Sequence, residues 1–147
     1  MKRKVLFLSS SGVHGAMAEA LLNRIGAENF EAVSAGAVRG KLDSFTVEIM
    51  RETSIDLSHV MLRSIEEFKG KEFDYVIRIG NCPEFDEIKF RQAEVIQWTF
   101  ENPDMNSTDL DRLLRTLRTM RDQITQRLHL LVLVLVPRTA ALATATN

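Results

Sequence analysis

Residues 5–22, VLFLSSSGVHGAMAEALL, decide the fold of this chain. The first four are apolar without interruption, which favours a short strand buried on both faces. A loop of small residues, 9–15, follows. Apolar residues then recur at helical spacing, so we expect a helix that begins at about Ala16 and ends at Gly26. A strand, a small-residue loop and a helix N-terminus together form an anion cradle, because backbone N–H groups and the helix dipole point the same way.

The side chains of this loop determine what the cradle can do. The candidate anion-binding residues are Ser9, Ser10, Ser11, Gly12, Val13, His14 and Gly15. This set contains no cysteine, lysine or arginine. Three interpretations stay open: small residues that only let the chain turn, weak binding of phosphate or sulfate without turnover, and a catalytic serine–histidine pair. For the third, no acidic residue that would orient His14 is identifiable.

Strands and helices alternate along the rest of the chain. Further strands are expected over residues 30–34, 73–79 and 93–97, and helices after Asp43 or Ser44 and after Ser107 or Thr108. A capping pattern at Ser64 predicts a short helical turn. This order predicts an α/β fold with a parallel sheet and helices on both faces. Ligands of such folds bind at the carboxyl ends of strands, which places the candidate site at loops 9–15, 80–85 and 98–104.

The C-terminal stretch departs from this order with seven consecutive apolar residues. They form a candidate interaction segment: Leu130, Leu131, Val132, Leu133, Val134, Leu135 and Val136. The segment is either the buried end of the last helix or an exposed surface for another copy or a partner. Alternating Val and Leu favour a strand as much as a helix, and Pro137 is expected to stop any helix. We expect one domain, residues 1–136, and a disordered tail, residues 137–147.

Charge and cysteine usage narrow the classes of function. The chain has 147 residues and a formal net charge of −1, from 19 basic and 20 acidic residues, which favours neither nucleic acid nor an anionic membrane as a partner. The arginines at 112, 115, 118 and 121 are expected on a solvated helix face. A single cysteine, Cys82, excludes an internal disulfide and a multi-cysteine metal site, and indicates a reducing, cytoplasmic compartment. No cofactor and no metal are expected.

Several stretches together resemble the low-molecular-weight protein tyrosine phosphatase superfamily, and within it the thioredoxin- and glutaredoxin-linked arsenate reductases. The resemblance covers residues 4–128 and rests on VLFL and MAEALL within 5–22, VSAG at 33–36, IMRETSIDLS at 49–58, FDYVIRI at 73–79, Cys82-Pro83, and WTFENPD at 98–104. It implies a flavodoxin-like three-layer sandwich with a four-stranded parallel sheet.

The resemblance also implies a set of catalytic groups, and the chain departs from it at each position. A cysteine nucleophile, a loop arginine and a general-acid aspartate are implied where Ser9, Gly15 and Asn102 stand, so these three positions are interpreted as vestigial. Gly80 stands where the first resolving cysteine belongs. Cys82 remains as a structural residue or a possible redox thiol, and one cysteine cannot form the intramolecular disulfide of a redox cycle.

These departures predict a catalytically inactive relative that acts through protein–protein contacts, with self-association or an unknown protein partner, and with weak phosphate or sulfate binding in the first loop. The alternative is a divergent active arsenate reductase or protein tyrosine phosphatase with a rebuilt site, for example with Asp104 as the acid. Each missing group typically contributes about 10²-fold or more to the rate. The sequence therefore favours the inactive interpretation.

Overall fold

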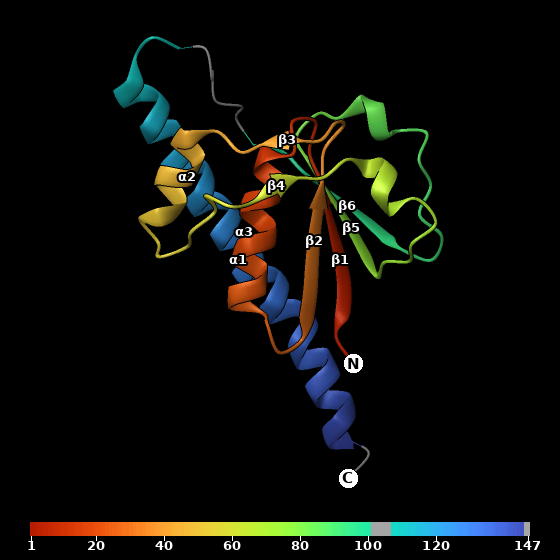
Figure 1. The fold of residues 1–147 in the computed structure, drawn as a ribbon. Helices are drawn as coiled ribbons and strands as arrows, with labels where there is room; N and C mark the ends of the chain where they lie inside the picture. The colour runs from red at the N-terminus through yellow and green to blue at the C-terminus, as the bar shows by residue number, and fades with distance from the viewer. Residues whose placement is uncertain (101–106, 146–147) are drawn as a thin grey trace.

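The structure, a computed structural model, describes residues 1–100 and 107–145, with side chains described as far as residue 136. Four parallel strands form its central sheet: β1 (Arg3–Leu8), β2 (Phe30–Ala35), β5 (Tyr75–Ile79) and β6 (Glu94–Trp98). They lie in the order β2-β1-β5-β6 (Figure 1). From β1 the chain first adds β2 on one side of β1, and later adds β5 and then β6 on the other side. The direction in which strands are added therefore reverses at β1. Ligand sites of α/β folds lie at this reversal.

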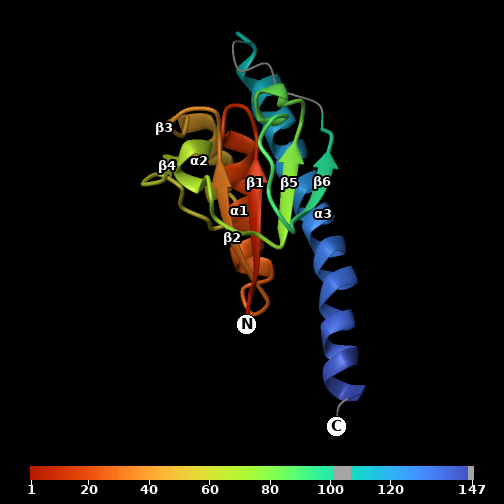
Figure 2. The ribbon, with the colours of Figure 1, turned by 90° about the vertical axis from the view of Figure 1, so that its right-hand side faces the viewer.

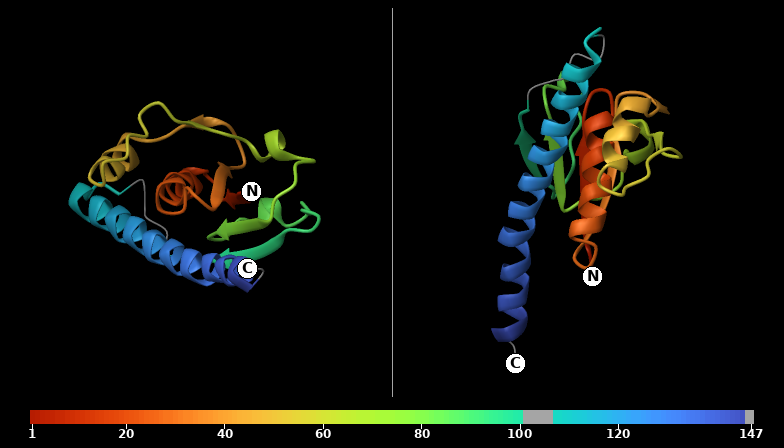
Figure 3. Two further views of the ribbon diagram at one scale, coloured as in Figure 1. Left: turned by 90° about the horizontal axis from the view of Figure 1, so that it is seen from below. Right: turned by 90° about the vertical axis from the view of Figure 1, so that its left-hand side faces the viewer.

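Two long helices cover one face of the sheet. α1 (Val13–Ile25) packs on β1 and β2, and α3 (Leu110–Ala145) packs on α1 (Figure 3). α2 (Ser44–Arg51) packs on α3. The core of this layer includes these buried side chains: Phe7, Met17, Leu22, Ile77, Met120, Ile124 and Leu128. Burial of such aliphatic and aromatic groups is the main source of stability of the layer.

The opposite face carries two short 3₁₀ helices, η1 (Ile65–Phe68) and η2 (Pro83–Phe85), with their connecting segments. A second core lies beneath them: Leu6, Leu8, Ile65, Phe68, Phe73, Val76, Cys82 and Phe85. Since β1 contributes to both cores, it is buried on both faces, as its continuous apolar sequence predicts. The expected α/β sandwich with a four-stranded parallel sheet is confirmed. A small antiparallel pair, β3 (Gly40–Lys41) with β4 (Met61–Leu62), was not predicted.

The capping signals identify most helix ends. The Asp43 carboxylate accepts a hydrogen bond from the Thr46 N–H at 2.9 Å, Gly26 follows the end of α1, and Ser64 forms a capping box with Glu67. The prediction that Ser107 or Thr108 caps the last helix is wrong, because the helix begins at Leu110. Asp109 precedes it, and its carboxylate accepts from the Arg112 N–H at 3.1 Å.

Residues 130–136, for which the sequence left helix and strand open, are helical and belong to α3. The helix continues through Pro137 to Ala145. The expected stop at Pro137 is therefore wrong. Proline removes one backbone donor and does not by itself end a helix that neighbouring contacts hold. Figure 2 shows α3 continuing well past the end of the sheet. Disorder of the tail stays a prediction. None of the described helices is apolar over a length sufficient to cross a membrane.

Candidate functional site

The first and second predicted loops meet at the carboxyl edge of the sheet. The Ser10 hydroxyl, after β1, donates to the Asn81 carbonyl at 3.2 Å, after β5. The Gly80 N–H donates to the Trp98 carbonyl at 2.8 Å at the end of β6. Loops 9–15 and 80–85 therefore lie together at this edge as predicted, and of the third loop only residues 98–100 are described. Asn102, the vestigial acid position, and Asp104 lie outside the described residues.

Ser9 stands at the nucleophile position but its hydroxyl has a structural partner. Its oxygen accepts a hydrogen bond from the Gly15 N–H at 3.1 Å, and the residue is 1% exposed. No histidine, carboxylate or lysine has a hydrogen bond to this hydroxyl among the described residues. A serine hydroxyl without a base is a weak nucleophile. The local geometry therefore lacks the features of an activated serine.

The loop itself is shorter than predicted, because α1 begins at Val13 and not at about Ala16. Gly12 precedes the helix with a φ of 83°, a conformation that glycine adopts without strain. The Val13 N–H donates to the Ser11 hydroxyl at 3.2 Å, and the Gly12 N–H to the Ser9 carbonyl at 3.1 Å. The Gly15 N–H donates to the Ser9 hydroxyl as described above, so three backbone amides of the predicted cradle have hydrogen-bond partners within residues 9–15. An anion at these amides would replace those bonds.

The position predicted for a loop arginine, Gly15, has little room for any side chain. A Cβ atom there would lie 3.3 Å from the Phe7 carbonyl oxygen, the Ser34 Cβ and the Ser9 hydroxyl. His14, the preceding residue, is partly buried, and burial lowers the pKa of its imidazole, an effect that nearby Asp43 partly opposes. His14 is therefore mostly neutral at pH 7 and adds little positive charge to the loop.

Cys82 is fully buried behind the end of β5. Its thiol lies 3.5 Å from the Arg78 Nε and donates to the Gly80 carbonyl at 3.6 Å, while Arg78 also pairs with Asp86 at 2.6 Å. A redox-sensitive thiol must be reached by the oxidant. The burial supports the structural role of Cys82 over the redox role.

The predicted interaction segment, 130–136, is divided between two faces of α3. Leu135 is buried, and Leu131, Val132 and Val136 pack against the main core. Leu130, Leu133 and Val134 are exposed at 61%, 65% and 59%. Each of the two alternatives, a buried helix end and an exposed contact surface, therefore describes only part of the segment, since a helix presents only every third or fourth residue to one side. Its role in protein contacts stays a prediction. Leu110, the first residue of the same helix, is also exposed.

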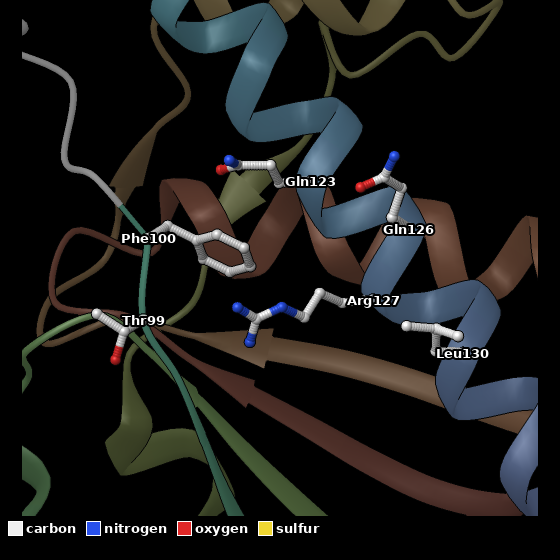
Figure 4. Close-up of a pocket in the computed structure, with 6 residues that line it drawn as sticks. All are labelled: Thr99, Phe100, Gln123, Gln126, Arg127 and Leu130. Atoms are coloured by element: carbon white, nitrogen blue, oxygen red, sulfur yellow. The ribbon is translucent and has the colours of Figure 1, made fainter.

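Two groups of residues were not recognised in the sequence. One is the cluster of Glu52 with Arg118 and Arg121, where two of the arginines expected on a solvated face pair with the carboxylate of the residue that follows α2. The other is a cleft between the end of β6 and α3, lined by Thr99, Phe100, Gln123, Gln126, Arg127 and Leu130 (Figure 4). Only the fold brings these residues together, because they come from segments more than twenty residues apart.

The sheet order, the loop after β1 and the helix that begins at Val13 define an α/β protein in which a short loop joins the end of the first strand to a helix N-terminus. Residues 4–132 match the family described as low molecular weight phosphotyrosine protein phosphatase, and the chain belongs to this family.

Characterised relatives agree with this assignment. The chain is 26% identical over 133 residues to a glutaredoxin arsenate reductase from Synechocystis sp., covering 90% of this chain and 97% of the relative. A solved arsenate reductase in a phosphate-binding state is 25% identical, with a TM-score of 0.74 over 90% of this chain and 97% of that one. An arginine phosphatase from Geobacillus stearothermophilus shares the fold at 15% identity, with a TM-score of 0.72 over 95% and 96% of the two chains.

Proposed function

We propose that this protein is a non-catalytic member of its family that acts through protein–protein contacts. The observation that supports this most is the state of Ser9. The residue at the nucleophile position is buried, and its hydroxyl oxygen accepts from the Gly15 N–H. The position for an oxyanion-binding arginine is Gly15, where a Cβ atom would lie 3.3 Å from each of three neighbouring atoms. A nucleophile and a charged clamp would both have to come from elsewhere.

Weak anion binding in residues 9–15 is a secondary part of this proposal. Backbone amides at a helix N-terminus attract anions whatever the side chains are. Because the amides of Gly12, Val13 and Gly15 already have partners, we expect any binding to be weak and to strengthen as His14 is protonated in acid solution. Backbone amide shifts of Gly12 and Val13 that stay constant in millimolar phosphate would exclude it.

The competing proposal is an active enzyme with a rebuilt site, and the similarity to a glutaredoxin arsenate reductase favours arsenate as its substrate. The two proposals are separated by an activity assay. The purified protein is given p-nitrophenyl phosphate, and separately arsenate with glutathione and glutaredoxin or with thioredoxin. We expect rates equal to the protein-free background. Turnover that disappears in Ser9→Ala or in Cys82→Ser would establish the enzyme instead.

A further inference from the structure

The cleft between the end of β6 and α3 has a volume of about 530 Å³, and none of the residues that line it belongs to the first loop. Thr99 and Phe100 form its wall on the side of the sheet. Gln123, Gln126, Arg127 and Leu130 form its wall on the helix (Figure 4). The cleft therefore combines an aromatic ring, amides, one cation and an aliphatic side chain. Protein–protein interfaces combine the same kinds of group: aromatic and aliphatic side chains, polar groups and arginine.

Arg127 is the charged group of the cleft. Its guanidinium carbon lies 4.9 Å from the centre of the Phe100 ring and 6.0 Å from that of Trp98. Within residues 1–100 and 107–136 no carboxylate forms an ion pair with it, in contrast to Arg118 and Arg121, which both bind Glu52. Stacking on a ring uses the face of a guanidinium and leaves its in-plane N–H donors available for a carboxylate.

The helix side of the cleft continues into the exposed apolar residues of α3. Gln123, Arg127, Leu130 and Val134 follow one another at spacings of four, three and four, and Gln126 and Leu133 lie on the same side. Residues at these spacings share one face of a helix. We call this the 123–134 face. At about 1.5 Å per residue it extends for roughly 18 Å, which is three helical turns.

We propose that the 123–134 face binds an amphipathic helix of a partner protein, one whose apolar side chains pack on Leu130, Leu133 and Val134 and whose carboxylate pairs with Arg127. This inference rests on the proposed function through protein contacts and specifies its surface and partner. An apolar stripe at helical spacing is the surface on which a second helix docks. An unpaired cation at one end of the stripe fixes the direction and the charge of that helix.

Charge complementarity argues for a different protein and against a second copy of this chain. Residues 123–136 contain Arg127 and His129 and no acidic residue. A parallel pair of α3 helices in register would place Arg127 opposite its own counterpart, and an antiparallel pair centred on Leu130 would place it opposite Leu133. In these two registers, which pack the apolar residues on one another, no carboxylate lies directly opposite Arg127. Like charges across a helix interface destabilise it, whereas an acidic partner gains an ion pair.

The test uses the full-length protein and a fluorescein-labelled peptide of about 20 residues, long enough to form a helix on binding. The peptide has leucines at spacings of three and four and glutamates beside them, and a control peptide has lysines in place of the glutamates. Binding is followed by fluorescence anisotropy. We expect the glutamate peptide to bind more tightly than the lysine peptide.

Matched variants assign the contacts. Arg127→Gln is expected to weaken binding of the glutamate peptide by roughly fivefold, which is the upper range for an exposed ion pair. Arg115→Gln removes another exposed arginine of the same helix and is expected to leave the affinity unchanged. The double variant Leu130→Ser with Leu133→Ser is expected to weaken binding of both peptides. The control Leu110→Ser is expected to change the binding of neither peptide. All of these side chains are exposed, so circular dichroism melting curves are expected to show the wild-type fold.

Three results would overturn the inference: equal binding of the two peptides, binding unaffected by the double serine variant, or no binding at all. A wild-type dimer in sedimentation that dissociates in the double serine variant would assign the face to a second copy and overturn it as well. None of these results affects the activity assay. If the protein shows no turnover and also fails to bind the peptides, the inference about the 123–134 face is rejected and the proposed function is retained. Measured turnover would reject the proposed function whatever the peptides do.

Discussion

At the scale of single residues, Gly36 shows how the first loop is held in place. A Cβ atom at Gly36 would lie 2.8 Å from the Gly12 nitrogen, 2.9 Å from the Gly12 Cα and 3.0 Å from the Ser11 carbonyl carbon. All three are backbone atoms, which cannot rotate away. The glycine of the VSAG stretch therefore permits the end of β2 to pack directly against the loop after β1.

This close approach predicts the effect of a single methyl group. Gly36→Ala is expected to lower the free energy of unfolding by about 2 kcal/mol, because the loop must shift to make room. Gly40→Ala is the matched control, since a Cβ atom there meets nothing within 4 Å. Urea unfolding of the two variants measures the difference. Equal stability of both would show that the loop is not packed as described.

At the scale of elements, Glu52 joins the end of α2 to α3. Its carboxylate accepts from Arg118 at 2.8 and 3.0 Å and from Arg121 at 2.8 Å, and Arg121 also donates to the Ile49 carbonyl at 2.9 Å. These hydrogen bonds lower the pKa of Glu52 to about 2 from an ordinary value of 4.5. Two helices distant in sequence thus share one charged contact at the surface.

The lowered pKa predicts a pH dependence of stability. A carboxyl group whose pKa is lower in the folded chain stabilises the fold fully above its ordinary pKa, and this contribution disappears as the pH falls from 4.5 through about 2. Glu52→Gln is therefore expected to be less stable than the wild type at pH 7, with the difference shrinking below pH 4.5. Glu28→Gln, at an exposed glutamate that forms no ion pair with the described residues, is the control. Thermal melting at several pH values measures both, and a constant difference would contradict the assignment.

The sequence predicts the elements better than their ends or their contacts. β1, α1 and β2 follow from uninterrupted apolar residues, helical spacing and Gly26, all of which are local signals. The start of α1 at Val13 was missed because hydrogen bonds from the loop amides to Ser9 and Ser11 complete the first turn, and such bonds depend on the folded loop. The continuation through Pro137 was missed because proline removes one backbone donor and can weaken or kink a helix at one point without ending it.

At the scale of the whole molecule, the chain has the family fold, whereas Ser9, Gly15 and Gly80 stand where the resemblance implies a nucleophilic cysteine, an arginine and a resolving cysteine. Ser9 and Gly80 are at the predicted edge of the sheet, and the substitutions at these positions were visible in the sequence. What the sequence did not show is that the Ser9 hydroxyl is occupied by the Gly15 N–H and that Arg127 stacks on Phe100. Both depend on contacts between neighbouring elements, which spacing alone does not reveal.

The central claim, that no nucleophile operates in the first loop, is tested most directly by trapping. The protein is mixed with p-nitrophenyl phosphate, or with arsenate and glutathione, quenched in acid, and its intact mass and peptide masses are measured. Because the Ser9 hydroxyl is buried and no base within residues 1–100 and 107–136 is hydrogen-bonded to it, we predict the unmodified mass under every condition. A phosphoryl or arsenic adduct on Ser9 or on Cys82 would contradict this account.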